Sequence, residues 1–256
     1  MSPQDPLTRL VLFLQSLPPE VLWPVMLAAC FSAVLALHRF FGEAGLYAYV
    51  VVAILGANIQ VLKAVKFAVY QEPVALGTVM FASSFLATDI LSEHYGTKRA
   101  RAGVLLGLVC YLIFTIFMIL TLGFAPLTPE QAGEEMAWAI ASHEHLTAIF
   151  SHSPALFGAG MIAYLLSQLH DVWLFERLKQ RFAGRHLWLR NTLSTAVSAF
   201  LDNLIFSLLA WIVFAADPLP LHTVFWTYVV GTYWLRLIVA ALDTPFVYLA
   251  RRWSPR

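Results

Sequence analysis

The sequence predicts an all-α fold, a polytopic bundle of transmembrane helices, on three observations. The chain of 256 residues is 60% hydrophobic and only 12% charged. That is about half the charged share of a typical soluble domain, so much of the surface must face lipid. Lipid leaves only helices and closed barrels able to satisfy the backbone. The apolar runs are roughly 20 residues long rather than ten-residue alternations, which favours helices.

In chain order, residues 1–20 form an amphipathic lead-in, because Pro18 and Pro19 interrupt a short apolar stretch. A single transmembrane domain then covers residues 21–253, with a polar, acidic outer loop at residues 123–154. Apolar windows predict about seven spans, or six if the first run does not cross. The second and third should form a tight helical hairpin. The predicted spans are residues 21–37, 46–67, 74–91, 102–122, 156–175, 193–215 and 224–249.

Basic residues set the predicted orientation. Lys and Arg gather between spans three and four, between spans five and six, and after the last span. The loops at residues 123–154 and 216–222 contain neither. Because cytoplasmic loops carry the excess of basic residues, we expect a cytoplasmic C-terminus. Seven spans then place the N-terminus outside, although Arg9 opposes this.

Four acidic residues lie in or at the ends of apolar runs. An ionisable group inside the bilayer is costly and is a functional-site candidate by default. Counted at 1.5 Å per residue, Asp89 lies about 12–14 Å from Lys98, Asp243 the same from Arg251, and Asp202 roughly 18 Å from Arg190. Asp171 is nearer the inner interface. All four fall between that interface and the midplane, where a shared cavity is expected; an ion pair or a helix cap is the structural alternative.

Other polar residues share helical faces with these aspartates. One stripe on span six consists of Asn191, Thr195, Ser198 and Asp202. A second stripe on span five consists of Tyr164, Gln168 and Asp171. Asn58 lies near the middle of span two. Interhelical hydrogen bonding is the ordinary role of such residues, and above all of a lone hydroxyl such as Ser198.

The sequence contains no Walker loop, nucleophile elbow or zincin helix. We therefore expect no ATP-driven pump in this chain alone, no catalytic residue and no cofactor. The histidines of the outer loop match no metal-binding spacing, so we expect a solvated loop and no metal site. These histidines are His143, His145 and His152.

Four blocks resemble the bacterial inner-membrane queuosine precursor transporter family, once grouped as vitamin-uptake transporters. They follow the family's order from about residue 46 to residue 252. The blocks are residues 88–96 (TDILSEHYG) followed by Lys98-Arg99-Ala100, residues 163–175 (AYLLSQLHDVWLF), residues 186–191 (HLWLRN) with Ser194, Thr195 and Asp202, and residues 242–250 (LDTPFVYLA).

The resemblance implies uptake of 7-cyano- and 7-aminomethyl-7-deazaguanine for queuosine synthesis in tRNA, with no direct contact to nucleic acid. A carboxylate can accept both adjacent N–H donors of a guanine-like edge, and aromatic rings can stack on the base. We expect Asp171 and Asp202 to read that edge with Gln168, Asn58 and Asn191 as amide partners. Asp89 and Asp243 come next, and Thr195 and Ser198 complete the predicted site.

Other functions stay open from the sequence. The chain could be the substrate-binding membrane subunit of a multi-component vitamin or nucleobase uptake system. It would then dock through a small-residue patch such as Gly103 with Gly107 or Gly158 with Gly160. It could be an intramembrane enzyme with two carboxylates as acid and base, or a structural subunit. Transport could be proton-coupled or facilitated, with the solute trapped by metabolism. A homodimer would suit the size but is not demanded.

Overall fold

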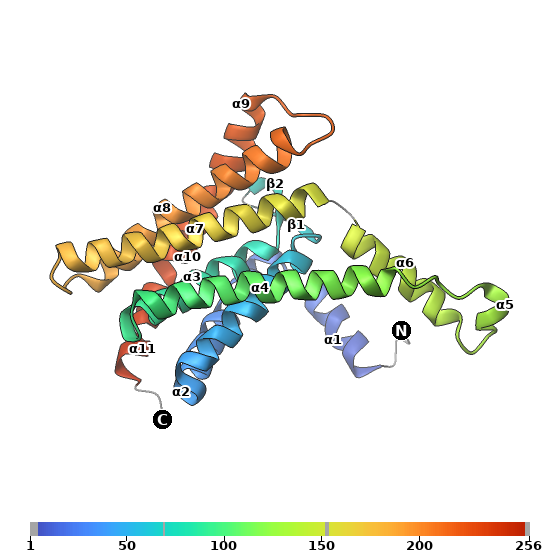
Figure 1. Cartoon of the computed structure of the whole chain (residues 1–256), viewed down its shortest axis with the longest axis horizontal. Helices are drawn as coiled ribbons and strands as arrows, with labels where there is room; N and C mark the ends of the chain where they lie inside the picture. The colour runs from blue at the N-terminus through green and yellow to red at the C-terminus, as the bar shows by residue number, and fades with distance from the viewer. Residues whose placement is uncertain (1–4, 69, 152–153, 254–256) are drawn as a thin grey trace.

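The computed structural model describes residues 5–68, 70–151 and 154–253. This part of the chain is mostly helical (Figure 1), as predicted, but it also contains one two-stranded sheet. The elements are α1 (Pro6–Gln15), α2 (Pro19–Gln60), β1 (Ala64–Phe67), β2 (Tyr70–Ala75), α3 (Gly77–His94), α4 (Thr97–Leu122), α5 (Pro129–Ala132), α6 (Ala137–Ser151), α7 (Pro154–Arg181), α8 (Leu187–Leu208), the π-helical η1 (Leu209–Val213), α9 (Leu221–Thr223), the π-helical η2 (Val224–Val230), α10 (Gly231–Leu242) and α11 (Thr244–Arg252).

The α2 segment is a helical hairpin rather than one long span. Its 42 residues would extend about 63 Å as a straight helix, twice the thickness of a bilayer core. Gly42 has φ 58° and ψ −131°, a conformation that requires glycine. A Cβ added to Gly45 would lie 2.2 Å from the carbonyl oxygen of Leu37, so the chain reverses between them. The two arms, residues 19–41 and 43–60, correspond to the first two predicted spans.

The central helix of the bundle is α3. It packs against α2, α4, α7, α8, α10 and α11, and every residue from 82 to 92 is buried. Because neighbouring helices surround it, α3 needs no lipid-facing apolar stripe and can carry Ser84, Thr88 and Asp89. The outer helix α4 shows the opposite pattern. Its exposed side chains are large and apolar, including Leu105, Val109, Ile116 and Phe117.

Four helical segments in the described residues are long and apolar enough to cross a membrane: Pro19–Gln60, Thr97–Leu122, Leu187–Val213 and Leu221–Arg252. The helices α3 and α7 fall outside this set. Both carry the buried polar residues that lower mean hydropathy, although α7 is 28 residues long. The seven-span count and the orientation stay predictions, but a multi-pass arrangement follows from these segments.

A β-hairpin stands where the sequence predicted a helical connection between spans two and three. The strands β1 and β2 pair antiparallel, with Val65 opposite Val74. The apolar residues Phe67 and Val74 are buried against Leu235 of α10, so the alternating strand pattern anchors the hairpin to the bundle. Pro73 cannot donate the backbone hydrogen bond that a helix needs. The second span therefore ends before residue 67, and the third begins at Gly77.

The region predicted as an outer loop contains two helices within residues 123–151. Thr128 and Gln131 form a capping box at the start of α5. The helix α6 then carries the exposed Trp138 and the histidines His143 and His145; His152 lies outside the described residues. In Figure 1, α5 and α6 extend beyond the ends of α4 and α7. The α3–α4 and α7–α8 connections and α11 lie toward the opposite end.

The last two predicted spans are interrupted. Helix α8 continues as η1, and the seventh span runs through α9, η2 and α10 before a break at Asp243. Pro245 lies in the first turn of α11, which explains why a new helix begins there. The span predicted at residues 224–249 is therefore made of successive helical segments, within the candidate span Leu221–Arg252. π-Helical turns are often found at functional sites.

Candidate functional site

A cavity of about 410 Å³ lies between α2, α3, α4, α7, α8 and α10, at the end of the bundle that carries the β-hairpin and α6. The β-hairpin contributes Pro73 and Val74, and the end of α6 contributes Ile149 and Phe150. A volume of this size is typical of small-molecule sites. The cavity therefore lies toward the end of the bundle opposite the basic α3–α4 and α7–α8 connections.

An ion pair forms part of the cavity wall. The guanidinium of Arg236 on α10 donates to Asp202 Oδ2 on α8 at 2.5 Å, and the hydroxyl of Ser167 on α7 donates to Oδ1 at 3.0 Å. The same guanidinium lies over the ring of Phe81, 5.3 Å from its centroid. The carboxylate of Asp202 is thus held by two neighbouring helices, while its residue still lines the cavity.

Aromatic rings make up much of the remaining wall. Trp211 of η1 and Tyr228 of η2 lie 4.9 Å apart between ring centroids, tilted by 34°. Tyr164 lies edge-on to Phe81 and donates its hydroxyl to the Val104 carbonyl at 3.0 Å. Trp211 Nε1 and Arg236 Nε are buried without a hydrogen-bond partner among the described residues. The π-helical segments thus bring a free donor and stacking surfaces to one pocket.

Below the cavity, Gln168 ties α7 to α3. Its Nε2 donates to Ser84 Oγ at 2.7 Å, and its Oε1 accepts from Thr88 Oγ1 at 3.1 Å. Both hydrogen-bonding groups of the amide are therefore used within the bundle. Two residues further along α7, His170 Nδ1 bonds the hydroxyl of Ser198 at 2.9 Å. This layer separates the cavity from the deeper aspartates.

The deeper aspartates form a cluster that we call the carboxyl cluster: Asp89 on α3, Asp171 on α7 and Asp243 at the start of α11. Asp89 interacts electrostatically with both others, and Asp243 with Asp171. All three are fully buried. Asn191 Nδ2 donates to Asp243 Oδ1 at 2.6 Å, and Thr195 Oγ1 to Asp89 Oδ2 at 3.3 Å.

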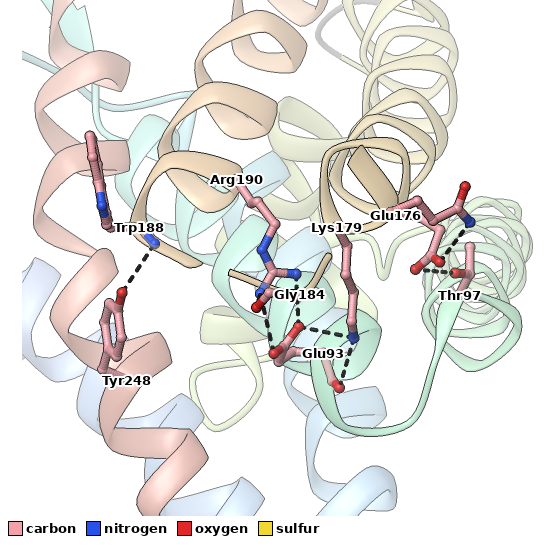
Figure 2. Close-up of polar contacts among 9 residues, drawn as sticks. Glu93, Thr97, Glu176, Lys179, Gly184, Trp188, Arg190 and Tyr248 are labelled. Atoms are coloured by element: carbon pink, nitrogen blue, oxygen red, sulfur yellow. Dashed lines mark hydrogen bonds and ion pairs between the residues drawn. The ribbon is translucent and has the colours of Figure 1, made fainter. Parts of the chain in front are cut away.

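An ionic contact closes the far end of the bundle, as Figure 2 shows. Glu93 of α3 accepts from both Nη atoms of Arg190 at 3.1 and 3.3 Å and lies 3.0 Å from Lys179 Nζ. Arg190 is fully buried, and its guanidinium also lies over Phe175. We call this trio of Glu93, Arg190 and Lys179 the inner clamp.

The structure divides the predicted site residues into two groups. Asp202 and Asn58 line the cavity, although the Asn58 amide donates to the Ile54 carbonyl of its own helix. Asp171, Asp89 and Asp243 lie together in the carboxyl cluster instead of beside Asp202. Of the other predicted residues, Asn191 and Thr195 donate to the carboxyl cluster, Gln168 bonds Ser84 and Thr88 of α3, and Ser198 bonds His170 of α7.

Arg236 was missed from the sequence, as were the donor role of Trp211 and the pairing of Glu93 with Arg190. The signal for Arg236 was present, because an arginine inside an apolar run is as costly as an aspartate. Trp211 gave no such signal, since tryptophans also form interfacial belts.

Long apolar helices around a cavity, with buried carboxyls beneath it, define a multi-pass membrane protein built to pass a small solute. A sequence model of the family described as "Putative vitamin uptake transporter" matches residues 75–250. The "Probable queuosine precursor transporter" of Bacillus subtilis (strain 168) is 32% identical over 228 residues, which cover 88% of this chain and 91% of that protein. No solved structure matches significantly. The chain belongs to this vitamin uptake transporter family and is a transporter, not an enzyme.

Proposed function

We propose that this chain imports queuosine precursors, the 7-deazaguanine bases, across the bacterial inner membrane. Two observations together support the proposal. A relative of this chain is named for this solute, and the cavity is lined by aromatic rings with one carboxylate in its wall. The paired Asp202 and Arg236 offer an acceptor and a donor side by side. A guanine-like edge carries both kinds of group.

The solute's contacts can be assigned by chemistry. Asp202 keeps lone pairs that can accept from the N–H groups of the base. Trp211 Nε1 and Arg236 Nε are donors without a partner among the described residues, and suit its carbonyl oxygen. The rings of Tyr228 and Phe81 provide surfaces for stacking. Because Arg236 balances the charge of Asp202, the cavity favours the neutral 7-cyano base over the cationic aminomethyl base.

The orientation predicted from the basic loops gives the cavity a direction. With the C-terminus in the cytoplasm, the cavity faces outside, and the inner clamp closes the cytoplasmic side. The conformation then corresponds to the state that receives solute. Import requires the reverse state, in which the clamp separates and α3 moves relative to α7 and α8.

Of the two small-residue patches suggested for the subunit alternative, the pair Gly103 and Gly107 packs inside the bundle. A Cβ on Gly103 would lie 3.0 Å from Leu91 and Tyr47, and one on Gly107 would lie 2.5 Å from Ile54. These glycines therefore serve close packing within the bundle and do not form a docking patch. The homodimer stays a prediction, which size alone supports.

Restoration of queuosine in tRNA tests the proposal. Cells that can neither make nor import the precursor would express the chain and receive 7-cyano-7-deazaguanine at low concentration. We expect wild type to restore queuosine and Asp202→Asn, at a matched membrane level, to restore little. Asp217→Asn, in an exposed loop, is the control and should behave as wild type. If well-expressed wild type restores nothing, the proposed solute is wrong.

A further inference from the structure

The carboxyl cluster has no cation to balance it among the described residues. Asp89, Asp171 and Asp243 are fully buried, and the charged groups that act on them are one another. The nearby cations are engaged elsewhere: Arg190 and Lys179 by Glu93, and Arg236 by Asp202. Three ionised carboxylates in such a place would repel each other at low dielectric. The cluster therefore needs bound positive charge.

Several carboxyl oxygens of the cluster lack hydrogen-bond donors, and a bound proton would supply one. Neither carboxyl oxygen of Asp171 receives a hydrogen bond of normal geometry among the described residues, although the Ser194 and Ser198 hydroxyls lie close to it. Asp89 Oδ1 and Asp243 Oδ2 also lack a partner there. Asp89 and Asp171 lie within hydrogen-bonding reach of each other. Two ionised carboxylates cannot donate to each other, but one protonated carboxyl can donate to its neighbour.

A metal ion fits the same place less well. Among the described residues, no three His, Cys, Asp or Glu side chains are arranged to hold one. The direct approach of Asp89 to Asp171 leaves these oxygens paired with each other and not spread around a larger ion. Calcium or sodium sites need several oxygens directed at one point. A proton needs only two.

The surroundings show which groups would influence this proton. Helix α8 faces the cluster with Asn191, Ser194, Thr195 and Ser198, which are neutral, and with Arg190 at its start. Helix α7 contributes Lys179 and His170, which bonds Ser198. Helix α10 contributes Arg236. From α2, His38 contacts His94 near the end of α3, and Arg251 of α11 also acts on His94. From α4, Arg99 pairs with Glu43 of α2.

The same stripe links the cluster to the cavity. On α8, Ser198 lies beside Asp171 and one turn before Asp202, whose carboxylate is in the cavity wall. On α7, Ser167 contacts Asp202 and its neighbour Gln168 bonds α3 immediately before Asp89. A change in the charge of the cluster can therefore alter how α3, α7 and α8 pack around the solute.

We propose that the carboxyl cluster is a proton-binding site and that its proton is carried inward with each solute molecule. The inference rests on the proposed function for the identity of the solute but not for the existence of the proton site. Protonation in the outward-facing state would lower repulsion between the three helices. Release to the cytoplasm, once the inner clamp opens, would restore the charges and reset the carrier.

The transport test uses the purified full chain in liposomes. One arm measures exchange of labelled 7-cyano-7-deazaguanine without any gradient, and the other measures accumulation driven by an alkaline interior with the membrane potential clamped. One proton per neutral solute predicts about tenfold accumulation for a gradient of about one pH unit. Asp89→Asn should keep exchange but lose the driven accumulation. Asp171→Asn should do the same, and Asp217→Asn should behave as wild type.

A second measurement does not depend on the solute. Infrared spectra of the purified protein at neutral pH should show the carbonyl stretch of a protonated, buried carboxyl, and Asp89→Asn should weaken it while Asp217→Asn leaves it unchanged. Absence of this band in wild type overturns the proton site. Accumulation that ignores the pH gradient, or follows a sodium gradient, overturns the coupling. If the band is present but no exchange of the cyano base occurs, the proposed solute fails and the proton site stands.

Discussion

Arg236 on α10 holds Asp202 on α8 across the wall of the cavity, with 2.5 Å between Nη1 and Oδ2. Only 13% of the arginine side chain and 5% of the aspartate side chain are exposed. Because each charge is compensated mainly by the other, the pair acts as a unit in folding. The same pair supplies the polar chemistry of the proposed solute site, so its two roles can be separated by mutation.

Single removal of either charge should be worse for stability than removal of both. Asp202→Asn and Arg236→Gln each leave an unpaired buried charge, at a cost of about 3 kcal/mol. The double variant should recover most of that stability but no uptake. Thermal unfolding in detergent and solute uptake would measure the two effects. A double variant as unstable as the sum of the single variants would contradict the pairing.

Loss of the inner clamp should loosen the end of the bundle that carries the basic connections. Glu93→Gln leaves the buried Arg190 without its carboxylate, and we expect a loss of about 3–5 kcal/mol in stability. Glu176→Gln is the matched control, because Glu176 bonds only the neutral Thr97 and Gln180 in the contacts of Figure 2. Thermal unfolding compares the two. Equal losses would mean that the clamp has no special role.

Trp211 should contribute one hydrogen bond to solute binding. Trp211→Phe keeps an aromatic ring but removes the Nε1 donor, and loss of roughly 1 kcal/mol corresponds to about a fivefold rise in KM. Trp226→Phe is the control, since Trp226 is exposed on η2. Uptake kinetics measure the change. An unchanged KM in Trp211→Phe would exclude this donor from the site.

The turn of α2 should require glycine. Gly42→Ala places a side chain where φ is 58°, at a cost of about 1–3 kcal/mol. Gly158→Ala should be tolerated, since its Cβ would lie 3.7 Å from Phe214, an ordinary contact. The amount of folded protein in the membrane, read with a fluorescent fusion, compares the variants. Equal amounts would argue against the tight turn.

Reporter fusions test the orientation. Alkaline phosphatase, active only outside the cytoplasm, should be active when fused after Gly133 and inactive when fused after Gly184. The prediction follows from the absence of basic residues in the first region and their abundance in the second. The opposite result would invert the cavity and assign the inner clamp to the outer face.

The sequence predicted the helical class well because lipid permits few alternatives, but it located helix ends poorly. Apolar windows count residues without regard to periodicity, so they included Val65 and Phe67 in a helix although these residues belong to a strand. The turn at Gly42 could not be recognised as a sharp reversal. The turn depends on a positive backbone φ, and hydropathy, which measures side-chain polarity, does not report it.

For the candidate site, residue type predicted which side chains lie in the polar interior. It did not predict which of these side chains contact each other. Every deep aspartate lies in the polar interior, and the stripe from Asn191 to Asp202 is buried along its length. Yet Asp171 was expected beside Asp202, whereas it faces Asp89. Depth along a helix follows from counting residues, but the rotation of one helix against its neighbour depends on packing that no single helix encodes.

The tight turn at Gly42 has a consequence for how the protein is made. A reversal that brings Gly45 against the Leu37 carbonyl leaves almost no chain between the arms to be held on one side of the membrane. The side chains of Cys30 and Tyr49 already contact each other across the arms. We expect the two arms of α2 to leave the translocon together, as one preassembled helical pair.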